Sequence, residues 1–483
     1  MTSSTAAHFR WALLGALAPK IISPITALAL PIFLEPRAFG LVAASTFVLT
    51  AVQMVAGMGA GSAVIQRQGD VEETASFAFW VAVTAGTVAF AATWWAAPFV
   101  EGAFRFAGLA AILRGSAISL PLAALAAVPV ALLQRRLSFS RLFWIGAVSQ
   151  IAGSATSLAL AVTGAGVWAL VLGPLVTVFI QAVLGFASAA WRPAAPWKTT
   201  MPLGVASFGL WVSASNAVSW SLLHADNAII GFFLGEETLG IYALGLKLAT
   251  VVPGMFTGPV STVAFPQFAR LHVQGPAEFG AHLLWLHRAL AAWVVPASIG
   301  VALVAPVVVP AIYGERWPGL PLAIVVLSVA LGPSNLWLIT AQAFRGAGFP
   351  QAWLKAALPT LVVMTVSLSV VAPAGLAWAV VARAVAAVLY AALSIHITAS
   401  LLSLSVRAQL RALTPALLPS AAMTMVVTAV ALIGRASGAV PGLMLAAAMA
   451  AIGALTYAHL LRRLSPAVAA DALELVGVAA GPA

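Results

Sequence analysis

The chain of 483 residues contains no cysteine, and only 7% of its residues are charged. The absence of cysteine excludes disulfide bonds, thiolate metal sites and cysteine nucleophiles. The low charge content argues against a water-soluble enzyme, because soluble globular domains carry about 25% charged residues. Hydrophobic residues make up 62% of the sequence and extend from Trp11 to Leu461 with brief polar interruptions. One signal peptide or anchor would account for one end only, so this distribution predicts a polytopic membrane protein.

The sequence also lacks the motifs of several pump and enzyme classes. It contains no GxxxxGK[ST] phosphate-binding loop, so this chain encodes no nucleotide-driven pump. It contains no HExxH motif, and no cluster of His and acidic residues suits a metal. The loops expected outside the membrane are short, whereas membrane glycosyltransferases, polymerases and ligases usually carry a large external loop. We therefore expect a protein that is not an enzyme and needs no metal or other cofactor.

Apolar stretches of helical length recur along the whole chain. A bilayer core about 30 Å thick needs about 20 helical residues, so the chain accommodates about 14 spans with short connections. The stretches are too long for barrel strands, which need about 9–11 residues of alternating pattern. The predicted spans are 11–33, 38–65, 76–99, 107–133, 141–163, 165–190, 204–233, 238–265, 282–312, 319–342, 350–371, 374–401, 413–434 and 440–461. The sequence thus predicts an all-α polytopic membrane protein with about 14 transmembrane helices.

Basic residues are concentrated in every second predicted loop. The chain has 23 Lys and Arg against 12 Asp and Glu, a net charge of +11. Cytoplasmic loops of membrane proteins are rich in Lys and Arg, so we do not expect this excess to indicate nucleic acid. With the amino terminus inside, the inner loops and ends hold Arg10, Arg67, Arg135, Arg136, Arg141, Arg192, Lys198, Arg270, Arg345, Arg407, Arg411, Arg462 and Arg463. Both termini are therefore predicted to be cytoplasmic.

A short sequence repeat suggests that the helices are organised as a duplicated unit. Residues 33–42 read FLEPRAFGLV and residues 233–242 read FLGEETLGIY. The identities pair Phe33 with Phe233, Leu34 with Leu234 and Gly40 with Gly240. Each segment joins two apolar stretches near the start of a set of about six spans, which predicts parallel six-helix lobes related by a pseudo-two-fold axis along the membrane normal. The expected domains are 1–192, 193–404, and 405–483 with two extra helices and a short cytoplasmic tail.

Several stretches within the first 270 residues form recognisable motifs. These stretches are LPIFLEPRAFGLVAAS at 30–45, GMGAGSAVIQRQG at 57–69, LLQRRLSFSRLFWIGAVSQIAGSATSLALAVTGAGVWALV at 132–171, DNAIIGFFLGEETLGIYALGLKL at 226–248 and PVSTVAFPQFARL at 259–271. The most specific is 132–171, which ends in a Gly-x-Gly-x-Trp-Ala-Leu turn. Together these stretches resemble the polysaccharide exporter family, which includes the O-antigen flippases. The same superfamily contains the multidrug and toxin extruders and the lipid II flippase.

The resemblance implies a fold and a function. The fold is two six-helix lobes around a central cavity, followed by two C-terminal helices. The function is translocation of oligosaccharide repeat units, linked to undecaprenyl pyrophosphate, across the bacterial cytoplasmic membrane for O-antigen, capsule or exopolysaccharide synthesis. Alternating access would expose the head group on each side in turn. The implied partners are the lipid-linked oligosaccharide, membrane lipids and a polysaccharide polymerase.

The ionisable residues inside the predicted spans are mostly cationic. Such groups cost several kcal/mol in a bilayer by most estimates, and they line a cavity or find a partner by default. A pyrophosphate carries about two negative charges, and the planar guanidinium of Arg binds phosphate oxygens in pairs. The candidate substrate-binding cations are Arg383, Lys20, Lys247 and Arg114. Each of three candidates also has an alternative to substrate binding. Lys20 would mark a shifted helix start, Lys247 would pair with Glu236 or Glu237, and the long side chain of Arg114 would reach the lipid head groups.

Asp226 is the only acidic residue placed inside a predicted span, and Asn227 follows it. A carboxylate in a membrane helix would bind a coupling Na⁺ or H⁺, which makes Asp226 and Asn227 the candidate ion-coupling residues. The structural alternative is a salt bridge to an intramembrane cation, or hydrogen bonding that orders the helix. Residues 350–401 contain no second acid, so a sodium site built on acids from two helices, as in the lipid II flippase branch, is not expected here.

The sequence leaves two other functions open. An ion-coupled multidrug extruder would have the same fold, although organic cations favour a cavity with more acidic and aromatic residues than this chain offers. A polytopic glycan polymerase or ligase is a third interpretation, and the short outer loops disfavour it. The cationic bias and the exporter-like motifs favour the flippase.

Overall fold

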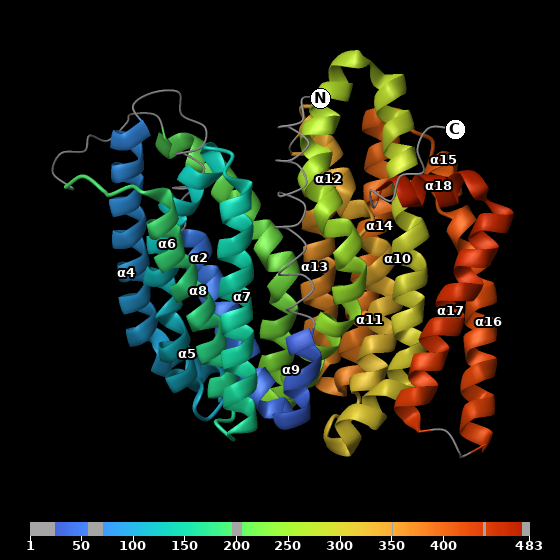
Figure 1. The fold of residues 1–483 in the computed structure, drawn as a ribbon, viewed down its shortest axis with the longest axis horizontal. Coiled ribbons are helices and arrows are strands. Elements are labelled where there is room, and N and C mark those ends of the chain that lie inside the picture. Colours follow the sequence, from blue (N-terminus) through green and yellow to red (C-terminus); the bar gives the residue numbers. More distant parts are fainter. Residues whose placement is uncertain (1–24, 57–70, 196–204, 350, 438–440, 476–483) are drawn as a thin grey trace. The chain divides into compact units, whose positions relative to one another are not determined.

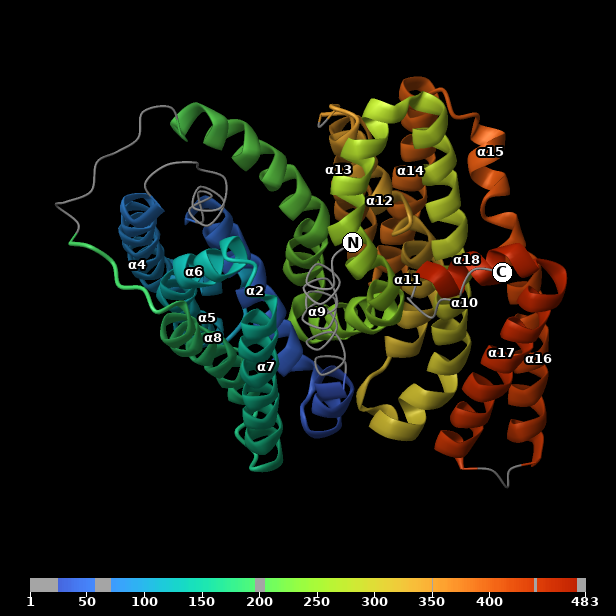
Figure 2. The same cartoon turned by 45° about the horizontal axis from the view of Figure 1, so that its top comes forward.

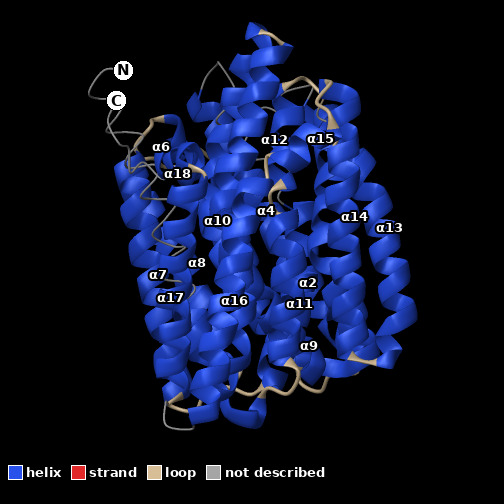
Figure 3. Ribbon diagram, turned by 90° about the vertical axis from the view of Figure 1, so that its right-hand side faces the viewer, coloured by secondary structure: helices blue, strands red, loops and turns tan. Residues whose placement is uncertain are grey.

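A computed structural model describes residues 25–56, 71–195, 205–349, 351–437 and 441–475. These residues form helices and loops and no strand (Figure 3). The α-helices are α2 Pro36–Ala56, α4 Val71–Phe104, α5 Leu109–Ala117, α6 Ser119–Arg135, α7 Phe139–Val162, α8 Trp168–Ala189, α9 Val205–Gln274, α10 Pro276–Tyr313, α11 Leu320–Ser334, α12 Trp337–Gly346, α13 Leu354–Val371, α14 Leu376–Leu402, α15 Val406–Arg411, α16 Thr414–Ser437, α17 Gly442–Leu464 and α18 Pro466–Leu475. The predicted all-α class is confirmed.

Twelve helical segments in the described part of the chain are long and apolar enough to cross a membrane. One of them, Ala217–Ser261, covers two of the predicted spans. The first predicted span, 11–33, lies mostly outside the described residues. The protein is therefore a multi-pass membrane protein, and the total of about 14 spans stays a prediction.

The long helix α9 contains one break in its helical geometry. Gly235 has φ 82° and ψ 175°, values that glycine adopts without steric cost. The break falls between the predicted spans 204–233 and 238–265, so the sequence placed this junction correctly. The chain divides shortly after it into two compact units, Met1–Gly240 and Ile241–Ala483. The lobes predicted at 1–192 and 193–404 rest on the sequence repeat and stay a prediction.

Small residues allow the helices of the first unit to pack closely. Figure 1 shows α7 and α8 running side by side, and each contributes a glycine to their contact. A Cβ atom on Gly153 would collide with the Thr177 hydroxyl, and one on Gly173 would collide with Ser157. Small residues let helix backbones approach in membranes, where packing rather than water exclusion holds helices together.

The two copies of the repeated motif meet where α2 contacts α9 in the first unit. A Cβ atom on Gly40 would fall on the carbonyl oxygen of Glu236, and one on Gly240 would fall on that of Pro36. Both glycines are buried. Next to them, the Arg37 Nε donates to Glu236 Oε1 at 2.7 Å. The glycines that the sequence repeat aligned thus allow two backbones to touch.

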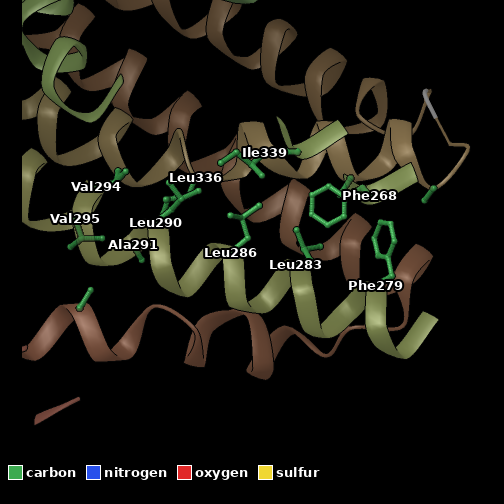
Figure 4. Close-up of a cluster of buried hydrophobic side chains, with 14 residues drawn as sticks. Phe268, Phe279, Leu283, Leu286, Leu290, Ala291, Val294, Val295, Leu336 and Ile339 are labelled. Atoms are coloured by element: carbon green, nitrogen blue, oxygen red, sulfur yellow. The ribbon is translucent and has the colours of Figure 1, made fainter. Parts of the chain in front are cut away.

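Helix α10 is central to the second unit and contacts α11, α16, α17 and α18. Its buried side chains recur at helical spacing and meet residues of α9 and α12, as Figure 4 shows. The labelled members include Phe268, Phe279, Leu283, Leu286, Leu290 and Ile339. This packing fixes the position of the first half of α10.

The short C-terminal helix α18 turns away from the direction of α17 and lies against α10 (Figure 2). Arg288 of α10 forms an ion pair with Asp471 of α18 at 2.5 Å between Nη2 and Oδ2. The Trp293 indole N–H donates to the Ala472 carbonyl oxygen at 2.9 Å. The guanidinium of Arg288 thus holds α18 against α10.

Candidate substrate and ion sites in the membrane helices

Arg383 lies in the second turn of α14, inside the candidate span Leu376–Leu402. Its neighbours Ala379, Val380 and Ala382 are buried, and its own side chain is half-buried. The structure therefore places this charge on a membrane helix of otherwise apolar composition. An arginine at such a position is a functional-site candidate by default because of its cost in lipid.

The structure describes one of the two lysine candidates, Lys247, and not the other, Lys20. Lys247 lies on the part of α9 that belongs to the second unit, and its side chain is exposed beside the buried Leu244 and Leu248. Glu236, one of the acids considered as its partner, bonds to Arg37 instead. Lys20 lies outside the described residues, so its role stays a prediction.

Arg114 of α5 is held against α4 by Trp94. Its Nε donates to the Trp94 carbonyl oxygen at 3.2 Å. The guanidinium carbon lies 5.3 Å from the centre of the Trp94 ring, within the range of a cation–π contact. These contacts give Arg114 a structural role that the sequence reading did not foresee, since α4 and α5 are separate spans in the sequence.

Asp226 is fully buried on the part of α9 that belongs to the first unit. Its carboxylate accepts a hydrogen bond from the Asn227 backbone N–H at 2.9 Å. The role of Asp226 in ion coupling stays a prediction, and the local hydrogen bond agrees with a helix-ordering contribution.

An aromatic and polar cluster fixes α9 against α2 one to two turns before Asp226. The Trp220 indole N–H donates to the Thr50 hydroxyl at 2.8 Å. The Trp220 ring also contacts Phe47, with centroids 4.9 Å apart, and His224, with centroids 5.9 Å apart. Sequence reasoning missed Thr50 and Trp220, because their side chains are 170 positions apart and neither is ionisable.

Asn227 adds an unsatisfied polar atom beside Asp226. Its side-chain oxygen is buried and has no hydrogen-bond partner within the described residues. Consecutive residues of a helix point in different directions, so Asp226 and Asn227 do not by their spacing alone form one ligand set. Among the described residues, no group of three or more His, Asp and Glu is placed to hold a metal ion.

The second unit contains an apolar cavity of about 500 Å³. Helices α9, α10, α16, α17 and α18 line it. Its lining includes the side chains of Phe256, Trp293, Val304, Met423, Met449 and Tyr457. One charged side chain, Arg462, is in the lining. A cavity of this composition suits a hydrocarbon chain better than a sugar, because few polar groups are present to replace bound water.

The model of a family described as polysaccharide biosynthesis protein matches residues 30–321, more than half of the chain. The chain belongs to this polysaccharide biosynthesis family. The match covers the residues that carried the exporter resemblance and continues beyond residue 271. The predicted relationship is therefore confirmed, and it extends further along the chain than the sequence motifs indicated.

Several relatives of the chain have names that refer to polysaccharide biosynthesis or transport. The chain is 29% identical over 297 residues to the teichuronic acid biosynthesis protein TuaB of Bacillus subtilis, covering 59% of this chain and 61% of that protein. It is 24% identical over 270 residues to the succinoglycan biosynthesis transport protein ExoT of Rhizobium meliloti, covering 54% and 53%. The lipopolysaccharide biosynthesis protein WzxC of Escherichia coli is 23% identical over 291 residues, covering 59% and 58%. The matches thus span a little over half of each relative.

Solved structures show the same fold. The lipid II flippase MurJ in an inward closed conformation superimposes with a TM-score of 0.68 at 13% identity, covering 96% of this chain and 99% of that one. An inward-facing multidrug resistance MATE family transporter of the MOP superfamily gives 0.55 at 14% identity, covering 80% and 98%. At such low identity the likeness establishes the fold and carries no functional assignment.

Proposed function

We propose that the protein is a flippase for lipid-linked oligosaccharides. Its substrate would be a repeat unit on undecaprenyl pyrophosphate, moved across the bacterial cytoplasmic membrane for O-antigen, capsule or exopolysaccharide synthesis. The family match over residues 30–321 carries this proposal. Relatives named for teichuronic acid biosynthesis and for succinoglycan transport support the substrate class. A polysaccharide polymerase would then take the translocated unit.

The intramembrane cations support a mechanism for the head group. Arg383 and Lys20 would neutralise the pyrophosphate, because guanidinium and ammonium groups replace the water that the anion loses in the membrane. Lys247 and Arg114 would contribute weaker fields, since Arg114 is also engaged by Trp94. The apolar cavity of the second unit supports accommodation of part of the lipid chain. Alternating access of the lobes 1–192 and 193–404, with both termini cytoplasmic, would complete transfer.

Reconstituted vesicles provide the test of this function. We expect purified protein to move a fluorescent lipid-linked oligosaccharide from the outer to the inner leaflet, where a membrane-impermeant quencher no longer reaches it. No glycosidic bond should form during the assay. Protein-free vesicles and vesicles with heat-unfolded protein are the controls. Formation of longer glycans would indicate a polymerase or ligase, and an absence of transfer by folded protein would contradict the flippase proposal.

A multidrug extruder is the alternative that the MATE-like fold favours. Such a protein should raise the resistance of a strain that lacks its own exporters to cationic dyes and drugs. We expect no such increase, because the cavity candidates of this chain are mostly cationic and repel cationic substrates. Clear resistance without saccharide transfer in vesicles would reverse this preference.

Asp226 provides a separate prediction about ion coupling. We propose that its carboxylate takes up a coupling H⁺ or Na⁺, so Asp226→Asn should abolish stimulation of transfer by an ion gradient. Transfer without a gradient should persist, because the amide keeps the size of the side chain. Glu237→Gln on the same helix is the matched control, since Glu237 is exposed. If Asp226→Asn retains full gradient stimulation, the buried carboxylate only orders the helix.

A further inference from the structure

A second cavity of the second unit has a strongly basic lining. Its volume is about 470 Å³, and it lies where the first half of α10 meets α15 and the beginning of α16. The α10 residues in its lining are Ala281, Leu284, Trp285 and Arg288, which share one face of the helix. The α15 side adds Ser405, Arg407, Ala408 and Arg411. Three arginines therefore border one cavity, and none of its lining residues is acidic.

The short helix α15 holds two of these arginines in a fixed orientation. The Ser405 hydroxyl caps the helix by accepting the Ala408 N–H at 3.2 Å. Gln409 is fully buried, and its amide donates to the carbonyl oxygens of Ile395 at 3.1 Å and Leu404 at 3.0 Å. Arg407 and Arg411 are four residues apart and so lie on the same face of the helix. Their side chains are exposed, and neither forms an ion pair within the described residues.

The third arginine completes the positive charge of the pocket. Arg288 is paired with Asp471 at 2.5 Å, and its Nε is buried without a hydrogen-bond partner in the described part of the chain. One acid thus offsets one of three arginines, which leaves an excess of about two positive charges. Guanidinium groups bind phosphate oxygens in pairs, and basic pockets between membrane helices bind lipid head groups on the cytoplasmic side.

We propose that this pocket, lined by Arg288, Arg407 and Arg411, binds a phosphate-bearing anion of about two negative charges. In the predicted topology, in which the loops rich in Lys and Arg are cytoplasmic, the pocket faces the cytoplasm. The phosphate belongs either to the head group of an anionic membrane lipid or to a free phosphate compound. The Trp285 ring and the aliphatic residues of α10 provide an apolar wall beside the anion. The proposal concerns binding and does not depend on the transported substrate.

The experiment compares two probes on the full-length protein. Inorganic pyrophosphate, titrated by calorimetry in neutral detergent, represents the free anion. Nanodiscs that contain phosphatidylglycerol or phosphatidylethanolamine, followed by native mass spectrometry of retained lipid, represent the head group. The test variant is Arg407→Gln/Arg411→Gln. The matched control is Arg270→Gln/Arg463→Gln, which removes two exposed arginines of the same unit that lie outside this pocket.

We expect the test variant to weaken binding of at least one probe by about 100-fold, because each lost guanidinium contact is equivalent to about tenfold. The control variant should bind like the unchanged protein. Weakened pyrophosphate binding identifies a free anion, and selective loss of retained phosphatidylglycerol identifies a lipid head group. Ala408→Glu keeps both arginines and adds a carboxylate to the lining, so it should weaken the same probe. Equal binding by the test and control variants for both probes would overturn the proposal.

Discussion

A protein with Arg383→Glu is expected to reach the membrane and to lose transfer of lipid-linked oligosaccharide almost completely. Arg383 is a candidate cation that lies within a candidate membrane span, Leu376–Leu402, on α14. Charge-assisted hydrogen bonds contribute about 1.5–3 kcal/mol each, so loss of attraction alone would slow transfer by about tenfold to hundredfold. Reversal of the charge adds repulsion of the pyrophosphate. The measurement is polymer display on cells, together with the vesicle transfer rate.

Two controls separate this effect from misfolding. Arg383→Lys keeps the charge and should retain part of the transfer rate, although an ammonium group lacks the paired donors of a guanidinium. Arg463→Glu makes the same charge change at an exposed position near the end of α17 and should leave transfer unchanged. Amounts in the membrane fraction and elution as a single species should be the same for all three variants. Normal display by a stable Arg383→Glu protein would remove Arg383 from the substrate site.

The positions of the membrane helices could be predicted because apolar length alone determines them. The prediction of 141–163 compares with Phe139–Val162 for α7, and that of 165–190 with Trp168–Ala189 for α8. About 20 apolar residues must be helical to satisfy their backbone in lipid. The prediction was less complete where polarity is mixed. The short helices α15 and α18 lie in segments that the span pattern treats as loop or tail.

The sequence did not predict contacts between residues that are far apart in the chain. Arg288 and Asp471 are 183 positions apart, and Asp471 lies in a segment that the reading assigned to the cytoplasmic tail. Hydropathy indicates whether a segment lies within the membrane, and it contains no information about which helices are neighbours. The burial of Asp226 was therefore predictable, whereas the Trp220–Thr50 hydrogen bond beside it was not.

The repeated glycines are the case in which a sequence pattern and a tertiary contact coincide. The alignment of Gly40 with Gly240 indicated duplication and gave no reason for the glycine itself. The structure supplies the reason, since a Cβ atom on either residue would fall on a backbone carbonyl oxygen of the facing segment. Backbone atoms cannot rotate away as a side-chain end does, so even a methyl group must move a helix.

Gly40→Ala and Gly240→Ala should therefore each lower the free energy of unfolding by about 1–3 kcal/mol. Substitution of either glycine by a residue larger than alanine should lower it further. Gly146→Ala in α7 is the matched control, because nothing lies within 4 Å of its added Cβ atom. That change should leave stability equal or raise it by about 0.5–1 kcal/mol, since alanine favours a helix. Thermal unfolding in detergent measures all three variants.

The ion pair next to the glycines provides a comparison for the size of their effect on stability. Arg37 and Glu236 have side chains that are 52% and 22% exposed, and exposed pairs contribute about 0–1 kcal/mol. Arg37→Gln should therefore change the unfolding temperature less than either glycine substitution. If Arg37→Gln is the more damaging change, the charges rather than the close backbone approach hold α2 against α9. If Gly40→Ala and Gly146→Ala unfold at the same temperature, the backbone contact has no energetic importance.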